Sequence, residues 1–156
     1  MKKISLVLAF SVCLVSCRQN EILREFRDDN LGDMTWAESE KFVFKANIEN
    51  DSIPYNFIVG IRHMFPIRYQ YITVNVSLIS SSGVILSKPY KIQLINDDKT
   101  PVGETAGNIS DVETPIIQGI TLQKGTYTIE IFPQSGEDLI GIMEVGIIVE
   151  KSQKSA

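Results

Sequence analysis

The stretch YITVNVSL, residues 71–78, indicates the fold class of this chain, because apolar and polar residues alternate along it without a break. One face would carry the apolar side chains Ile72, Val74, Val76 and Leu78. Successive side chains of a β-strand point to opposite faces, whereas those of a helix return to the same face every three or four residues. The period of two therefore predicts a strand with one buried and one wet face, as in an antiparallel sheet.

The same alternation continues on both sides of this stretch. Further apolar–polar runs cover residues 42–48, 55–61, 90–94, 116–122, 127–131 and 143–149. Turn-favouring residues separate several of these runs, at 50–52, 80–83 and 124–125. About seven or eight short strands without a long helical pattern predict an all-β chain. The expected architecture is an antiparallel β-sandwich, either jelly-roll-like or immunoglobulin-like.

The length of 156 residues suits a single domain. We predict four segments: a lipoprotein signal peptide at 1–16, a lipidated cysteine with its tether at 17–40, the sandwich at 41–150 and a frayed tail at 151–156. Within the tether, we expect residues 21–28 to form a short helix.

Residues 96–115 stand apart, because they combine glycines, prolines and acids and show no clear alternation. We predict a long loop here, and loops of this length are usually functional or mobile. Four acids of this segment are candidate Ca²⁺ ligands: Asp97, Asp98, Asp111 and Glu113. They lack the regular spacing of a known calcium loop, so turn formation and solubility are the favoured interpretation.

The N-terminus has the pattern of a lipoprotein signal. Lys2 and Lys3 precede an apolar run at residues 4–15, which is shorter than the ~20 residues needed to span a bilayer. The run ends in LVSC, residues 14–17, which resembles the bacterial lipobox, with small Ser16 before the cysteine. We therefore predict that Cys17 carries the lipid. The alternatives are an ordinary secretory signal with an incidental cysteine, or a buried N-terminal strand.

The residues after Cys17 bear on location. Arg18 stands where many lipoproteins retained in the inner membrane have Asp, so the resemblance implies the outer membrane. Surface-exported lipoproteins often carry several acids at this point, whereas residues 18–21 contain one. We therefore expect a lipid-anchored protein of the outer membrane that faces the periplasm.

Charge and cysteine content exclude several classes of partner and site. Without Lys2 and Lys3, 13 basic and 19 acidic side chains remain, a net charge of −6. An acidic chain without a basic cluster is not expected to bind nucleic acid. The other cysteine, Cys13, lies in the predicted signal peptide, so the mature domain has no disulfide and no thiolate zinc site.

Few residues point to catalysis. His63 is the one histidine, and we interpret it as a polar residue at the end of a strand. The sequence contains no Gly-x-Ser-x-Gly elbow and no phosphate-binding glycine loop, and nothing in it implies a cofactor.

Binding has better candidates, which flank the connection at residues 64–66. These are Arg62, Arg68, Tyr69 and Tyr71. Arg and Tyr are over-represented at binding hot spots. A purely structural role is the alternative: a cross-strand stack of Arg on Tyr, or Arg62 paired with a carboxylate.

Several blocks, taken in order, resemble the GldH family of gliding-motility lipoproteins. The blocks are YNFIVGIR (55–62), YQYI (69–72), residues 103–111 and LIGIMEVGI (139–147). The lipobox, the length and the block order fit the same family. This resemblance implies a role in gliding motility and no enzymatic activity, and it supplies no catalytic residues to carry over.

We therefore predict a lipid-anchored, non-enzymatic subunit or scaffold of a gliding-motility or other envelope machinery. Its expected partners are the membrane and other envelope proteins, with Arg62, Tyr69, Tyr71 and the 96–115 loop in contact. The first alternative is a lipoprotein that binds surface glycans through exposed aromatics, for which Trp36, Tyr69 and Tyr71 are candidates. A hydrolase is the least favoured alternative.

Overall fold

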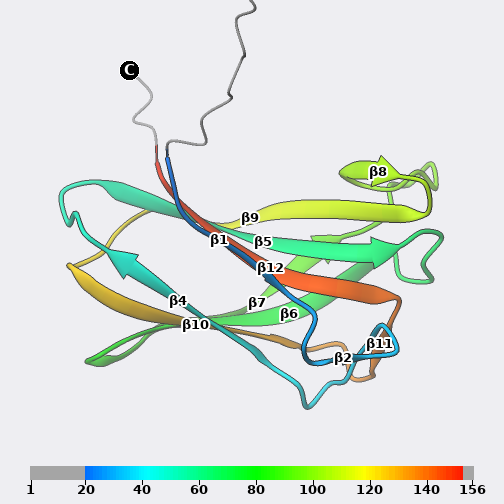
Figure 1. The fold of residues 1–156 in the computed structure, drawn as a ribbon, viewed down its shortest axis with the longest axis horizontal. Coiled ribbons are helices and arrows are strands. Elements are labelled where there is room, and N and C mark those ends of the chain that lie inside the picture. Colours follow the sequence, from blue (N-terminus) through cyan, green and yellow to red (C-terminus); the bar gives the residue numbers. More distant parts are fainter. Residues whose placement is uncertain (1–19, 153–156) are drawn as a thin grey trace, which may run out of the picture.

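The computed structural model describes residues 20–152, which form two antiparallel sheets packed face to face (Figure 1). The first sheet has the spatial order β1 (Glu21–Arg27), β12 (Ile142–Lys151), β5 (Pro54–Met64), β9 (Ile109–Thr121) and β8 (Glu104–Ala106). The second has the order β4 (Phe42–Ile48), β10 (Gly125–Pro133), β6 (Tyr71–Ser80) and β7 (Gly83–Gln93). A small third sheet contains β11 (Leu139–Ile140), β3 (Thr35–Trp36) and β2 (Leu31–Gly32). The predicted all-β, antiparallel fold is confirmed.

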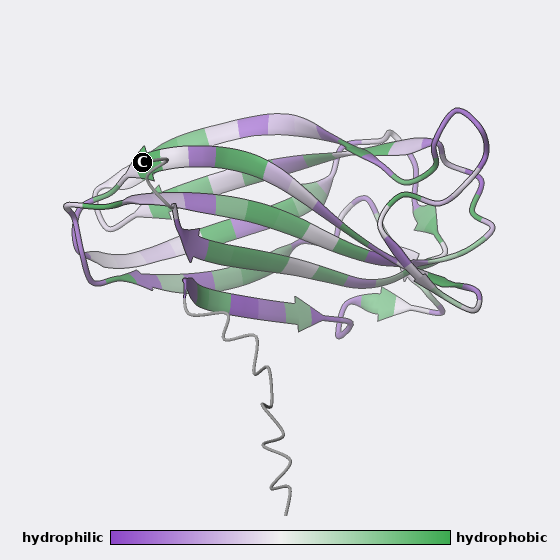
Figure 2. Cartoon of the chain, turned by 90° about the horizontal axis from the view of Figure 1, so that it is seen from above, coloured by the Kyte–Doolittle hydropathy of each residue, from purple (hydrophilic) through white to green (hydrophobic). Residues whose placement is uncertain are grey.

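The core lies between the two large sheets and is built by the alternation seen in the sequence. In β6 the residues 72, 74, 76 and 78 are all buried. Alternate residues of β5 are buried as well, namely Tyr55, Phe57, Val59 and Ile61. The banding of hydrophobic and hydrophilic residues along each strand is visible in Figure 2. Full burial of such side chains contributes roughly 1.5–3 kcal/mol each, so these faces hold the sheets together.

The predicted helix at 21–28 is wrong, since residues 21–27 form strand β1. This strand pairs antiparallel with β12, with Arg24 opposite Ile148 and Phe26 opposite Gly146. Leu23 packs against the core, and the ring of Phe26 lies on bare backbone at Gly146 on the outer face. Because β1 buries apolar surface on both of its faces, it is part of the sheet.

Most of the predicted tether is therefore folded. After β1 the chain forms β2 and β3, and Trp36 of β3 is fully buried. The Trp36 indole Nε1 donates a hydrogen bond to the backbone oxygen of Glu40 at 3.0 Å, and its ring meets Phe42 edge to face. Among the described residues, only Asn20 precedes the first strand. At the other end of the chain, Lys151 still belongs to β12, and residues 153–156 lie outside the described residues.

The predicted loop at 96–115 is also largely wrong, because it contains β8 and the first half of β9. Ser110 and Val112 of β9 are buried, whereas Asp111 and Glu113 project from the outer face. The alternation in the sequence is incomplete because the polar Ser110 occupies an inward position. The outward carboxylates bind Arg62 of β5 and Arg24 of β1. A turn and irregular chain remain at 96–103.

The strands run along the long axis of the molecule and give it two distinct ends (Figure 1). At one end β1 begins and β12 stops, and the Lys151 amide donates a hydrogen bond to the Asn20 carbonyl at 2.8 Å. The connections at 49–53, 81–82 and 122–124 lie at this end as well, which we call the terminal end. The opposite, far end holds the small third sheet and the connections at 65–70 and 134–138.

Candidate functional site

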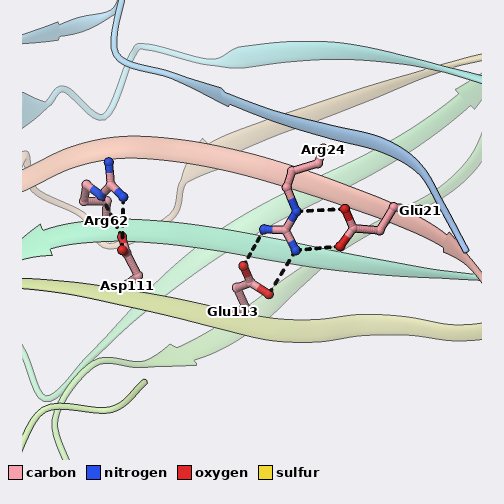
Figure 3. Close-up of polar contacts among 5 residues, drawn as sticks. All are labelled: Glu21, Arg24, Arg62, Asp111 and Glu113. Atoms are coloured by element: carbon pink, nitrogen blue, oxygen red, sulfur yellow. Dashed lines mark hydrogen bonds and ion pairs between the residues drawn. The ribbon is translucent and has the colours of Figure 1, made fainter. Parts of the chain in front are cut away.

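The outer face of the first sheet carries a row of ion pairs, and the first of them belongs to Arg24 of β1 (Figure 3). Its guanidinium binds both carboxylate oxygens of Glu21, at 2.9 and 2.8 Å, and reaches Glu113 of β9 at 2.6 Å. These hydrogen bonds, to Glu21 and then to Glu113, raise the pKa of Arg24 above its ordinary value. Arg24 thus links β1 to β9 across the face of the two intervening strands.

Arg62 of β5 forms the second group on this face. Its Nε and Nη2 bind the two carboxylate oxygens of Asp111 at 2.7 and 3.0 Å, and its Nη1 donates to Glu144 of β12 at 3.0 Å. The hydrogen bond to Asp111 is the main cause that raises the pKa of Arg62. The carboxylate pairing considered for Arg62 from the sequence is present, so its guanidinium is already engaged within the sheet.

The ring of Phe26 lies between these two ion-pair groups. Gly60 and Gly146 stand directly opposite each other on β5 and β12, and a Cβ added to either would come within 2.5 Å of the Phe26 ring. The face around this ring forms a shallow depression of about 270 Å³. Its charged lining comprises two arginines and four acids: Arg24, Arg62, Glu104, Asp111, Glu113 and Glu144.

Arg68 and Tyr69 lie at the far end, where the structure brings them together. The Arg68 guanidinium stacks over the Tyr69 ring at 4.7 Å and pairs with Glu137 at 2.9 Å. The Tyr69 hydroxyl donates to the backbone oxygen of Asp138 at 3.2 Å and accepts from the amide of Ile140 at 3.0 Å. These contacts tie the β5–β6 connection to β11.

Two exposed apolar side chains stand beside this stack. Ile140 of β11 is 55% exposed, and it pairs with Thr35, the residue after Met34, which is 40% exposed. The Met34 carbonyl also accepts the amides of Gly141 and Ile142, at 2.8 and 3.1 Å. We call the set Met34, Arg68, Tyr69 and Ile140 the far-end patch. Neither Met34 nor Ile140 was among the predicted binding residues. Nothing in the neighbouring sequence distinguishes these two exposed apolar side chains from buried ones.

Met34 has an unusual backbone. It and Asp33 have φ values of 56° and 50°, in the left-handed region that favours glycine or asparagine. Together they form the tight turn between β2 and β3. A bulky residue in this conformation is an outlier, and such outliers are concentrated at functional sites.

Tyr71 lies elsewhere, on the second sheet. It begins β6, is 49% exposed, and has the Lys91 ammonium 3.5 Å from its ring centre. Arg62 is on the outer face of the first sheet. The four predicted residues therefore fall into three places, and only Arg68 and Tyr69 share one. Trp36, a candidate for glycan binding, is fully buried, and that part of the glycan hypothesis is wrong.

His63 is buried on the inner side of β5. Its Nδ1 lies 2.7 Å from the Met64 backbone oxygen, and its Nε2 has no hydrogen-bond partner among residues 20–152. Burial is the main cause that lowers the pKa of His63. The side chain is therefore held neutral inside the fold and presents no acid or base at the surface.

The four acids considered as calcium ligands do not converge. Asp97 accepts a hydrogen bond from Gln70, and Asp98 accepts one from Thr100 in its own turn. Asp111 and Glu113 bind the two arginines of the outer face. Within the described part of the chain, no group of three or more His, Cys, Asp or Glu side chains is arranged to hold a metal ion.

Two findings concern the membrane. In residues 20–152 we find no helix with the length and apolar character needed to span a bilayer. The predicted signal peptide at 1–16 and the predicted lipidation site Cys17 lie outside the described residues.

Comparison with known proteins shows what the chain is similar to. The family model described as GldH lipoprotein matches residues 26–149. No curated protein matches the chain significantly. Among solved structures, dimeric latent PorU from Porphyromonas gingivalis is similar with a TM-score of 0.35 and 8% sequence identity, over 85% of this chain. The chain spans 13% of the length of that PorU chain. The match to the family model confirms the resemblance found in the sequence. Because the family model covers most of the sequence, this protein belongs to the GldH lipoprotein family.

Proposed function

We propose that this protein is a non-enzymatic subunit or scaffold of the gliding-motility machinery, anchored by lipid on Cys17 to the periplasmic side of the outer membrane. In this proposal the far-end patch binds another envelope protein. The family supports a gliding-associated, membrane-anchored lipoprotein. The residues after Cys17, with Arg18 and a single acid, support the outer membrane and the periplasmic side.

The observation that carries the proposal is the separation of the two ends. Asn20 lies at the terminal end, three residues after Cys17, so an anchored chain would have this end at the membrane. The far-end patch would then point away from the lipid. It combines exposed apolar side chains with an Arg–Tyr stack, the residue types that dominate binding at protein interfaces.

The polar groups of the molecule support a role in binding rather than catalysis. The arginines of the outer face are engaged by carboxylates, and His63 is buried and neutral. Several depressions on the described surface are open and lined largely by polar and charged side chains. A scaffold needs no more than a fixed location and a complementary surface, and anchoring raises the effective concentration of a membrane-bound partner.

The test is site-specific crosslinking in living cells. A photoreactive side chain at Met34 or Ile140 should capture a defined envelope protein, identified by mass spectrometry. The matched control places the same group at Lys45, which is exposed on β4 of the second sheet and lies away from the far end. Capture of the same proteins at the control position would contradict a specific far-end interface.

Substitution gives a second arm. Tyr69→Ala and Ile140→Asp should reduce recovery of that partner at least tenfold, as expected for the loss of a hot spot of about 1.4 kcal/mol or more. If both variants fold normally and retain every envelope partner, the far-end interface is refuted. Cys17→Ser tests the anchor itself, because its product should leave the membrane fraction.

Glycan binding remains the second candidate, and it depends on Tyr71. Gln70, Tyr71, Lys91, Gln93 and Asp97 line a depression of about 210 Å³ that offers an aromatic ring together with amide and charged groups. A glycan array should then show binding that Tyr71→Ala abolishes. An array without binding removes this candidate.

A further inference from the structure

The β6–β7 hairpin carries the most exposed apolar pair among the described residues. Val84 is 64% exposed and Ile85, its neighbour, is 46% exposed. Both lie at the start of β7, which is the last strand of its sheet and has no partner on its outer edge. The other exposed large apolar residues, Met34, Tyr71 and Ile140, lie toward the opposite end of the sandwich.

The tip of the hairpin is also uncharged. No Asp, Glu, Lys or Arg occurs from residue 69 to residue 87, which includes all of β6 and the turn that follows. Ser80 and Ser82 bind each other within the turn: the Ser80 hydroxyl lies 2.8 Å from that of Ser82, accepts the Ser82 amide at 3.2 Å and donates to the Gly83 carbonyl at 3.1 Å. Because these groups have partners within the turn, moving them out of water would cost little free energy.

The hairpin also lies at the end of the sandwich where β1 begins. It lies at the terminal end, where Ser81, Ile85, Lys124 and Tyr127 line one depression with the β9–β10 turn. In Figure 1 the hairpin reaches at least as far toward this end as the start of β1. Only Arg18 and Gln19 lie between Cys17 and Asn20, and the three Cα–Cα steps can span no more than about 11 Å. A lipid on Cys17 therefore holds this end within reach of the bilayer.

We infer that the β6–β7 hairpin is a second membrane contact, with Val84 and Ile85 inserted among the lipids to which Cys17 is anchored. The inference rests on the proposed lipidation. Apolar side chains at an interface enter about 5–10 Å, to the boundary between headgroups and acyl chains. The connections at this end carry both signs of charge, with Glu49, Asp51 and Lys124, so the contact is apolar and needs no anionic lipid.

The experiment uses the lipidated mature protein in phosphatidylcholine vesicles. Cys13 is removed with the signal peptide and Cys17 is acylated, so Val84→Cys introduces the one free thiol, which takes an environment-sensitive dye. Ile140→Cys at the far end is the matched control, since that side chain is equally apolar and exposed. Lipids carrying nitroxides near the headgroup should quench the dye at position 84 at least about threefold more than at position 140, independently of salt.

A second variant tests the cause. With the dye at Ser82→Cys, replacing Val84 and Ile85 by serine should lower quenching to the level at position 140. Equal quenching at positions 84 and 140 in vesicle-bound protein overturns the hairpin contact and leaves the anchor intact. If the emission of the dye at position 84 is shifted but is not quenched by the nitroxide lipids, protein covers the hairpin, and this result also overturns the inference. Protein that fails to float with the vesicles refutes the lipid anchor itself.

Discussion

At the scale of single residues, the attachment of β1 depends on two glycines. Gly60 and Gly146 leave a bare strip of backbone across β5 and β12, and the Phe26 ring lies on it. Any Cβ at these positions would overlap the ring. Neither glycine has an unusual φ, so their role is to make room for an aromatic side chain and not to bend the chain.

Gly146→Ala should therefore lower the free energy of unfolding by about 1–3 kcal/mol, the usual cost of overpacking. Denaturant unfolding monitored by Trp36 fluorescence measures it. Gly32→Ala is the control, since a Cβ there has no atom within 4 Å and should change stability by less than about 0.5 kcal/mol. In the background of Phe26→Ala, the cost of Gly146→Ala should largely vanish, and an unchanged cost would contradict the packing explanation.

His63 should make the stability depend on pH. Its folded pKa is lowered by burial, so the unfolded chain binds the proton more readily, and protonation favours unfolding. The contribution of His63 is fully present above its ordinary pKa of about 6.5 and is lost as the pH falls toward the folded pKa.

Thermal unfolding at pH 7.5 and 5.5 tests this prediction against His63→Leu. The melting temperature of the wild type should fall more between pH 7.5 and 5.5 than that of the variant, because the variant has no group to protonate at this site. The comparison uses the difference between the two pH values, so a change in packing in the variant does not affect it. Parallel losses in both proteins would show that His63 is not the cause.

At the scale of elements, the packing of β1 makes residues 21–27 part of the folded domain and not of a tether. Replacing Ile22, Leu23 and Phe26 by serine should destabilise the domain by on the order of 3 kcal/mol, because these side chains pack on the core or on the glycine strip. The same change at Val84 and Ile85, which are exposed, should cost less than about 0.5 kcal/mol in solution. Equal stability of the β1 variant and the wild type in urea unfolding would contradict its place in the sheet.

The sequence predicts most strands because their inward and outward residues differ in polarity. In β6, for example, Thr73 and Asn75 alternate with buried valines. The pattern fails for β1, because Ile22, Leu23 and Phe26 have helical spacing. Phe26 is apolar on the outer face because it covers Gly60 and Gly146, and these two glycines become neighbours only when β5 pairs with β12. The pattern is incomplete in the first half of β9 because the polar Ser110 stands at a buried inward position.

The site was predictable to a smaller extent, for the same reason. Arg68 and Tyr69 are neighbours in sequence, and their stack could be expected. The partners of Arg62 lie 49 and 82 residues away, and those contacts depend on the register of β5 against β9 and β12. Met34 and Ile140 come together only through the pairing of β3 with β11, two strands of two residues each.

At the scale of the whole molecule, the acidic chain should be indifferent to calcium. Asp97 and Asp98 bind groups of their own surroundings, and Asp111 and Glu113 bind arginines. Adding 5 mM or so of Ca²⁺, or EDTA, should therefore shift the melting temperature by less than about 1 °C, since a ligand stabilises only what it binds. A clear rise with Ca²⁺ that Mg²⁺ does not reproduce would mean that a site forms outside the described arrangement.

The neighbouring positions of Asn20 and Lys151 affect how the protein can be labelled. The last described residue, Ser152, donates its amide to the Pro54 carbonyl of β5, at the end of the sheet where β1 begins. A fluorescent protein or purification tag fused after β12 would thus start at the same end of the sheet as the proposed lipid anchor, where it would compete with the bilayer for space. Fusions of this kind should be expected to disturb anchoring, whereas a short epitope inserted in the turn at residues 97–100 would leave that end undisturbed.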